Sequence, residues 1–221
     1  SGLSQPWGVW DSIAFAWDRI KADPGTILGA LIVGSLIANA VSGVGQAIAS
    51  IDPNEQALQI VGGVLRLVNF FVSAFMTGGM TLFAIKVARG DNYEFGDIFK
   101  GAPYFLSVVV ASILVTLGVL LGTLLLIVPG IILGLGWAMT IPLVVDRQMG
   151  AIDAIRESWR MMDGHKLAFF LFGLLSLGLV LVGLLACCIG VFFVGPILQV
   201  AYAYIYLRIS GQRTAEMSPP V

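Results

Sequence analysis

Long apolar runs alternate with short polar segments along this chain. Six of these runs carry few or no charges and could form helices that cross a bilayer, at about residues 26–50, 58–88, 105–128, 131–145, 167–190 and 191–207. A helix rises about 1.5 Å per residue, so about 20 apolar residues cross the roughly 30 Å hydrocarbon core, and the fourth run is the shortest. The pattern therefore predicts an all-α polytopic membrane protein with six transmembrane helices in three hairpins.

An amphipathic pattern with helical period occupies the polar segments before the first and third hairpins, residues 7–23 and 150–163. Residues 10–20 can be laid over residues 152–162 without a gap, and the apolar positions then coincide: Trp10 with Ile152, Ile13 with Ile155, Trp17 with Trp159, and Ile20 with Met162. Both segments are too polar to span, which favours helices lying in the bilayer surface. A shorter stretch, Phe95–Phe99, precedes the middle hairpin. The match between these segments has two explanations. Either a unit of surface helix and hairpin is repeated three times, or the segments converged on the same amphipathic spacing.

The composition supports a membrane protein. Hydrophobic residues make up 58% of the chain, charged residues only 11%, and the mean hydropathy is +0.95. A soluble domain usually carries about 25% charged residues. The net charge of -1 argues against nucleic acid as a partner, because phosphate binding needs clustered lysines and arginines. The adjacent Cys187 and Cys188 lie in an apolar run, which fits buried packing and neither a metal site nor a disulfide framework.

The basic residues are distributed asymmetrically. In a six-helix arrangement, all of the 12 Lys and Arg residues except Arg66 fall on one side, in the N-terminal segment, the second and fourth connections and the C-terminal segment. The positive-inside rule then predicts a multi-pass protein of a bacterial inner membrane with both termini in the cytoplasm. The polar C-terminal residues 209–221 are predicted to form a disordered tail.

Aromatic and large apolar side chains on the surface segments are expected to lie where the bilayer meets water, because an indole ring is apolar with one polar N–H. The predicted membrane-interface residues are Trp7, Trp10, Trp17, Ile155, Trp159 and Met162. Three tyrosines near the end of the sixth run are predicted to form an aromatic belt at the same level: Tyr202, Tyr204 and Tyr206.

Small residues at four-residue spacing predict two faces on which helices approach closely. One consists of Ala30, Gly34, Ala38 and Ser42 in the first run, and the other of Gly118 and Gly122 in the third run.

Arg66, in the interior of the second run, has two interpretations. As an intramembrane charge it would mark a polar pathway together with Asn69. Alternatively, Arg66 precedes Lys86 by 20 residues, about 30 Å of helix, so the two lie at opposite interfaces and Arg66 can reach the headgroups. We favour the second interpretation, with Asn69 as an interhelical hydrogen-bonding group.

Several segments of the second half have a recognisable pattern: residues 95–106, 126–146 and 150–166, and Gly195-Pro196 with the residues up to Leu207. The Pro129-Gly130 turn, Asp146 at the end of the fourth run and the triplet Ser158-Trp159-Arg160 are the most specific parts. These segments resemble an uncharacterised bacterial family of six-span membrane proteins related to the membrane domain of glycerophosphodiester phosphodiesterases. The resemblance implies a helical inner-membrane domain and no established activity, and the catalytic domain of those enzymes has no counterpart here.

The sequence predicts no catalytic residues, no cofactor-binding residues and no metal ligands. There is no Gly-rich phosphate loop, paired acidic site or nucleophile–base arrangement, and the mixed charges of residues 153–163 fit pairing along the wet side of a helix. We therefore expect a non-enzymatic membrane protein that organises or senses the bilayer through interfacial helices, in contact with membrane lipids and with itself, as a homo-oligomer, or with another membrane protein. One alternative is a transporter or pore for a lipid or small amphiphile, with Arg66 and Asn69 at its outer mouth. Another is an anchoring or immunity-type protein that binds partners through residues 146–166.

Overall fold

The computed structural model of the 221-residue chain describes residues 7–52, 55–185 and 189–217. The regular elements in these residues are all helical. The α-helices are α1 (Val9–Ala22), α2 (Pro24–Ile51), α3 (Gln56–Arg89), α4 (Phe105–Leu125), α5 (Ile127–Gly136), α6 (Thr140–Asp146), α7 (Ala151–Met161), α8 (Lys166–Leu185) and α9 (Ile189–Ile209). The short 3-10 helices are η1 (Phe95–Phe99), η2 (Ala102–Tyr104) and η3 (Ala215–Met217). Cys187 and Cys188 lie outside the described residues, so their packing stays a prediction.

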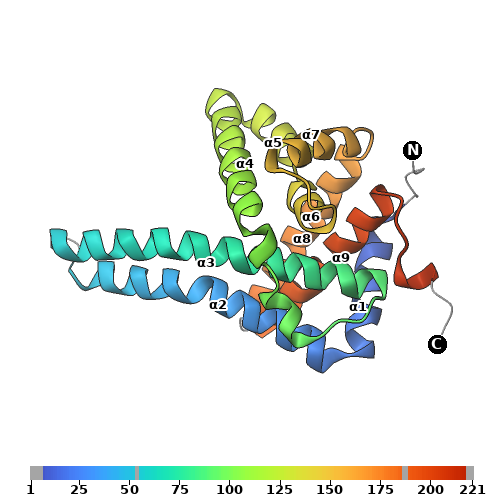
Figure 1. Ribbon diagram of the computed structural model, residues 1–221, viewed down its shortest axis with the longest axis horizontal. Helices are drawn as coiled ribbons and strands as arrows, with labels where there is room; N and C mark the ends of the chain where they lie inside the picture. The colour runs from blue at the N-terminus through green and yellow to red at the C-terminus, as the bar shows by residue number, and fades with distance from the viewer. Residues whose placement is uncertain (1–6, 53–54, 186–188, 218–221) are drawn as a thin grey trace.

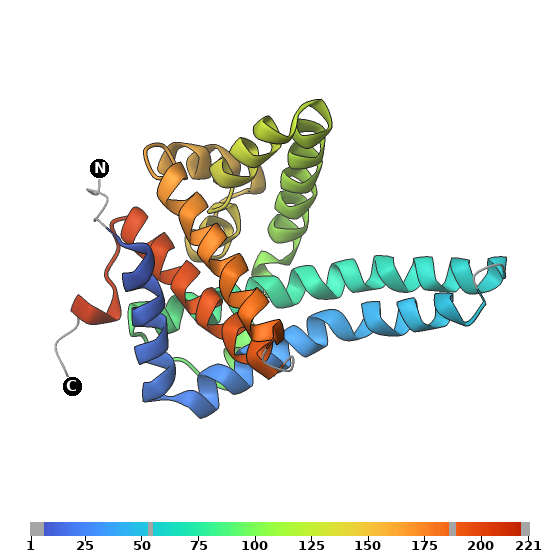
Figure 2. The same cartoon turned by 180° about the vertical axis from the view of Figure 1, so that it is seen from behind.

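Three hairpins diverge from a common base (Figures 1 and 2). They are α2–α3, then α4 with α5 and α6, and finally α8–α9. The base comprises α1, η1, α7 and η3 together with the ends of α3, α6 and α9. Six helical stretches in the described residues are long and apolar enough to cross a membrane: Pro24–Ile51, Gln56–Arg89, Phe95–Leu125, Ile127–Asp146, Lys166–Leu185 and Phe192–Ile209. The prediction of an all-α, multi-pass membrane protein is confirmed.

The α2–α3 hairpin extends farthest from the base (Figure 1). α2 begins where the Asp23 carboxylate accepts a hydrogen bond from the Thr26 backbone N–H (3.2 Å) and Pro24 occupies the first helical position. Proline suits this position because its missing N–H would have no intrahelical partner there. α3 ends at Gly90, whose φ of 79° lies in the left-handed region that glycine adopts without strain.

The predicted small-residue face of α2 packs inside the fold. Ala30, Gly34 and Ala38 are all buried. A Cβ atom on Gly34 would lie 2.7 Å from the Met80 sulfur of α3, so the two helices approach closely because residue 34 has no side chain. This face therefore sets the spacing of the first hairpin near the base.

The predicted close-packing pair on α4 also meets a neighbouring helix. A Cβ atom on Gly118 would lie 2.2 Å from the Trp137 ring, and one on Gly122 would lie 3.1 Å from the Gly130 backbone of α5. Gly118 and Gly122 therefore allow the second hairpin to close tightly.

The predicted boundary between the third and fourth runs is wrong by a few residues. The chain turns at Leu126, which is extended, and Pro129 lies inside the first turn of α5. A proline is tolerated in the first turn because the N–H that it lacks has no intrahelical acceptor. The fourth span also differs from the single helix predicted over 131–145, because a non-helical turn at residues 137–139 separates α5 from α6.

Each connecting segment packs on the hairpin before it, and the segment before the first hairpin packs on the last hairpin. η1 leads into the second hairpin but packs on α3 and α2 of the first. α7 leads into the third hairpin but packs on α6, α4 and α5 of the second. α1 leads into the first hairpin and packs chiefly on α9 of the third. The base is therefore a closed ring of contacts in which the first and last α-helices touch (Figure 2).

The prediction of a disordered tail over 209–221 is wrong for residues 210–217. This segment folds back onto the base, Thr214 is fully buried, and the Gln212 side-chain amide donates to the Asp146 carboxylate (2.8 Å). The sequence pattern missed this packing because the segment is polar, and its partners are polar groups buried at the ends of other helices.

The predicted aromatic belt is also wrong. Tyr204 and Tyr206 are fully buried and Tyr202 is half-buried, since alternate positions on a helix point in nearly opposite directions and reach different neighbours. The Tyr204 ring stacks on Phe15 of α1, with ring centroids 4.3 Å apart. These tyrosines join α9 to the rest of the base and do not line its outer surface.

Candidate membrane-interface site

α1 and α7 present the same pattern of burial. Three aligned pairs are buried: Ser12 and Ala154, Ala16 and Ser158, Ile20 and Met162. Two aligned apolar pairs are exposed: Trp10 (71%) and Ile152 (57%), Trp17 (47%) and Trp159 (39%). Each helix therefore docks by one narrow face and carries large apolar side chains on another. Such side chains lose stabilisation of about 25 cal/mol per Å² when left in water, and a surface helix recovers it by contact with lipid.

The predicted interface residues are not all equivalent. The tryptophans at positions 10, 17 and 159 are exposed, whereas Trp7 and Ile155 are half-buried. Met162 is fully buried, so its assignment to the interface is wrong. Its side chain packs into the core at the end of α7, in the same way as Ile20 at the end of α1.

Ser158 holds α7 against the break between α5 and α6. Its hydroxyl donates to the Gly136 carbonyl (2.9 Å) and accepts from the Met139 backbone N–H (3.0 Å), and all three groups are buried. The Tyr202 hydroxyl donates to the Ala138 carbonyl in the same turn. The break is tolerated because side chains from α7 and α9 satisfy the freed backbone groups.

Replacing Ser158 with alanine should lower the stability of the protein by about 1–3 kcal/mol, the cost of leaving buried polar groups unpaired. Denaturant unfolding of the purified protein in detergent micelles measures this change. Ser176→Ala is the matched control, because the Ser176 hydroxyl donates only to Phe172 within α8. Equal stability of the two variants would show that Ser158 does not support the break.

One apolar groove lies beside α1, and another lies beside the start of α8, just after α7. The first has a volume of about 310 Å³ and is formed by α1, α2 and α9. Lys21 is the one charged residue in its lining, and the other lining residues are Trp17, Ile20, Pro24, Leu28, Phe193 and Ile197. The other, of about 320 Å³, lies between α5 and α8 and is lined by Lys166 with Val128, Ile131, Ile132, Leu135, Leu167 and Phe170. The Lys166 ammonium lies 4.0 Å from the centroid of the Trp159 ring. An apolar groove with a lysine suits an acyl chain whose anionic headgroup lies beside the ammonium.

A buried carboxylate joins three segments of the base. Asp146, at the end of α6, accepts hydrogen bonds from Arg89 Nη2 (2.5 Å), the Tyr206 hydroxyl (2.8 Å) and Gln212 Nε2 (2.8 Å). Only 8% of the Asp146 side chain is exposed. Because a buried charge is stable only when it is paired and hydrogen-bonded, these contacts fix the ends of α3, α6 and α9 relative to one another.

A second buried carboxylate holds η1 between α2 and α3. Asp97 lies 2.9 Å from Lys86 Nζ and 2.5 Å from Lys100 Nζ, and it also accepts from the Glu94 backbone N–H (3.1 Å). The neighbouring Ile98 is fully buried. The middle segment is therefore inserted into the fold more deeply than the surface helix that the sequence predicts.

Tyr93 closes the corner where the loop before η1 meets α3. Its ring packs edge-on against Phe83, with centroids 5.6 Å apart. Burial, together with the nearby Asp23 carboxylate, raises the pKa of the Tyr93 hydroxyl, which therefore stays neutral at ordinary pH.

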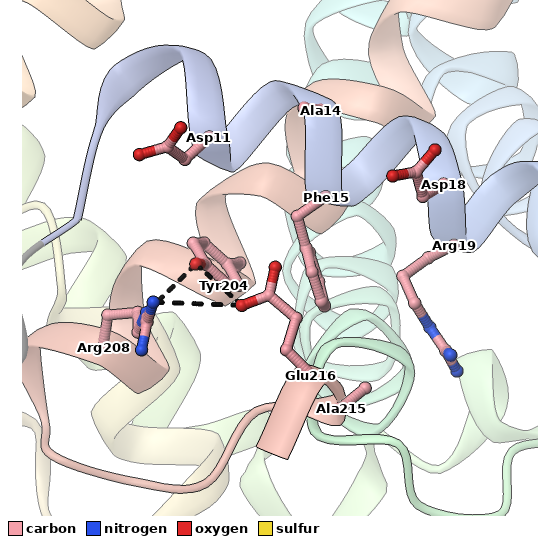
Figure 3. Close-up of a pocket in the computed structure, with 9 residues that line it drawn as sticks. All are labelled: Asp11, Ala14, Phe15, Asp18, Arg19, Tyr204, Arg208, Ala215 and Glu216. Atoms are coloured by element: carbon pink, nitrogen blue, oxygen red, sulfur yellow. Dashed lines mark hydrogen bonds and ion pairs between the residues drawn. The ribbon is translucent and has the colours of Figure 1, made fainter. Parts of the chain in front are cut away.

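A cavity of about 410 Å³ opens between α1, α9 and η3 (Figure 3). Its charged lining residues carry both signs: Asp11, Asp18, Arg19, Arg208 and Glu216. Arg208 Nε donates to the Tyr204 hydroxyl (3.0 Å), and its guanidinium lies 3.8 Å from the Glu216 carboxylate. The cavity is therefore a hollow with mixed charge on the base, different in character from the two apolar grooves.

Arg66 and Asn69 lie on the outer half of α3, away from the base. Asn69 Oδ1 accepts a hydrogen bond from the Ser42 backbone N–H of α2 (3.0 Å), the geometry that an interhelical packing role requires. Arg66 is exposed, and it lines none of the grooves or cavities of the base described above.

Among the described residues, no group of three or more His, Cys, Asp and Glu side chains is placed to hold a metal ion. The polar residues that lie together in the structure stabilise the fold, and the sequence pattern did not predict that they are close to one another. Asp146 was recognised as a specific position, but Arg89, Tyr206 and Gln212 lie on three other segments. No local spacing could have grouped these four residues.

The chain is similar to proteins of mycobacteria that are described as uncharacterised. It is 24% identical to one from Mycobacterium tuberculosis (strain H37Rv) over a 242-residue alignment covering 99% of this chain and 74% of the relative. A protein of Mycobacterium bovis gives the same values. No family model and no solved structure match the chain. The relatives are bacterial and carry no described activity, so the resemblance to the membrane domain of glycerophosphodiester phosphodiesterases stays a prediction.

Proposed function

We propose that this protein is a non-enzymatic component of a bacterial inner membrane that organises or senses the bilayer through α1 and α7. The observation that carries the proposal is the matched exposure of Trp10 with Ile152 and of Trp17 with Trp159 on two helices that are otherwise docked in the same way. In this proposal the base faces the cytoplasm, because nearly all of the basic residues belong to it.

The two apolar grooves support a lipid-directed role. Each combines aliphatic and aromatic walls with one lysine, so lipid acyl chains are the ligands that their chemistry favours. The grooves lie between hairpins, and a lipid seated there would respond to any change in how the hairpins diverge.

The placement of other residues favours this function over the two alternatives. Asn69 is engaged within the first hairpin and Arg66 lies on its outside, so neither forms the mouth of a cavity described above. In the segment 146–166, Asp146 and Ser158 are turned inward and bind other parts of the chain. That segment therefore offers less free polar surface to a protein partner than its sequence implies.

Replacing both Trp17 and Trp159 with glutamate should remove most of the effect of the protein on lipid order in reconstituted vesicles, because carboxylates are excluded from the apolar part of the interface. An order-sensitive fluorescent probe in the vesicles measures this effect. In variants in which Trp17 or Trp159 is the single remaining tryptophan, lipids brominated near the headgroup should quench its fluorescence more strongly than lipids brominated at the chain end.

The matched control is Arg156→Glu, which adds the same acid on the exposed polar face of α7. It should leave both readouts close to those of the unmodified protein. Lipid order that is unchanged in the double glutamate variant would remove the proposal, as would tryptophans quenched by aqueous acrylamide and not by brominated lipid.

A further inference from the structure

The first span carries a polar stripe although it contains no charged residue. Its members follow one another at intervals of four, three, four and four residues: Ser35, Asn39, Ser42, Gln46 and Ser50. Positions with this spacing lie on one face of a helix, and steps of three and four residues are those of the seam between two packed helices.

The stripe lies outside the packing of the single chain. Ser35, Asn39, Gln46 and Ser50 are exposed, and Ser42 is half-buried. The buried face of α2, which includes Gly34 and Ala38, lies about a quarter turn away around the helix. The stripe is therefore not needed to form the α2–α3 hairpin.

α3 extends this polar surface. Two hydrogen bonds cross the hairpin beside the stripe, from the Ser42 N–H to Asn69 Oδ1 (3.0 Å) and from Gln59 Nε2 to the Ala49 carbonyl (3.0 Å). Gln59 and Arg66 are spaced seven residues apart, and since the two right-handed helices are antiparallel, they project on the same side of the hairpin as the stripe. We call this side the polar flank. Exposed apolar residues occupy the opposite flank: Val44, Ile51, Val61 and Val68.

The carboxamides of the stripe are incompletely satisfied. Asn39 Nδ2 donates to the Ser35 carbonyl (2.7 Å), and the Ser35 hydroxyl donates to the Leu31 carbonyl (2.7 Å). Within the part of the chain that the structure describes, the Asn39 side-chain oxygen and the Gln46 amide have no hydrogen-bond partner. In hydrocarbon an unpaired amide is costly, so Asn39, which lies closer to the base than Arg66, favours another helix over lipid as its neighbour.

We propose that the polar flank of the α2–α3 hairpin packs against the same flank of a second copy of this chain, with α2 against α2. A carboxamide is both donor and acceptor, so a twofold arrangement that brings Asn39 to Asn39 and Gln46 to Gln46 is self-complementary. The contact runs along α2, which leaves Arg66 on α3 beside the seam and away from the twofold axis. The inference does not depend on the role of α1 and α7.

Cysteine crosslinking in membranes tests this arrangement. In a chain whose Cys187 and Cys188 are replaced by serine, Asn39→Cys and Gln46→Cys should form disulfide-linked dimers under a membrane-permeant oxidant. Val44→Cys, on the opposite flank of the same helix, is the matched control and should give little dimer. Equal crosslinking at positions 44 and 46 would overturn the proposal. So would labelling of positions 39 and 46 by a water-soluble maleimide without dimer formation, which would indicate a water-filled pore.

Energy transfer between two labelled populations in diluted vesicles gives an independent measurement. The variant Asn39→Leu with Gln46→Leu should weaken dimerisation at least about tenfold, since interhelical hydrogen bonds in membranes contribute about 1–2 kcal/mol in model peptides. Leucine inserts readily into a bilayer, so the hairpin should remain folded. Val44→Leu should leave the transfer efficiency unchanged. Undiminished energy transfer in the double leucine variant would overturn the proposal.

Discussion

Replacing Asp146 with alanine should lower the stability of the protein by about 3–5 kcal/mol, the usual cost of removing one partner of a buried ion pair. The loss is large because Arg89 would remain partly buried with only the longer of its ion pairs, that to Asp91 (3.7 Å), and the Tyr206 and Gln212 groups would lose their shared acceptor. The measurement is denaturant unfolding in detergent micelles. Tryptic cleavage after Arg213 should also accelerate, because the C-terminal segment would no longer be tied to α6.

Asp18→Ala is the control for this change. Asp18 forms an ion pair with Lys21 (2.8 Å) in which both side chains are mostly exposed, so its removal should cost less than about 1 kcal/mol. Asp146→Asn should fall between the two, because asparagine keeps the shape of the side chain but not its charge. If Asp146→Ala and Asp18→Ala were equally stable, the buried carboxylate would not be what joins the helix ends.

Gly79→Ala should destabilise the protein by about 3 kcal/mol, near the upper end of the usual range for an overpacked site. A Cβ atom at position 79 would lie 1.8 Å from the Ile98 carbonyl oxygen, and backbone atoms cannot yield as a flexible side chain can. α3 and η1 would have to separate, which would also strain the contacts of Asp97 with its two lysines. The same unfolding assay measures the loss.

Gly63→Ala provides a control on the same helix, since a Cβ atom there meets nothing within 4 Å. Alanine exceeds glycine in helix propensity by about 1 kcal/mol, so this variant should be neutral or slightly more stable. Similar losses in the two variants would attribute the effect to glycine in α3 generally and not to the contact with η1.

The spanning helices and their close contacts could be predicted because they depend on local features of the sequence. Uninterrupted apolar runs identify the spans, and small residues one helical turn apart identified the packing faces at Gly34 and Gly118. Helical period also indicated both surface helices. These signals lie within single segments, so one sequence suffices to find them.

The base could not be predicted in the same way, because its contacts join segments far apart in the chain. Asp146 meets Arg89 and Gln212 across intervals that no local pattern encodes. Tyr206 is of a residue type that is common at membrane interfaces, but its hydrogen bond to the Asp146 carboxylate accounts for its inward position. Met162 completes a regular apolar stripe, yet only the fold shows that this position docks inward while Trp159 remains outside.

The cyclic packing of the base has a consequence for how the protein is made. Of the α-helices described above, α1 leaves the ribosome before the others, whereas α9, against which it packs, leaves after them. Until α9 has entered the membrane, the buried face of α1, with Ser12, Phe15 and Ile20, lacks its main partner within the chain. The three hairpins can insert one after another during translation, whereas the base closes only when synthesis of α9 is complete.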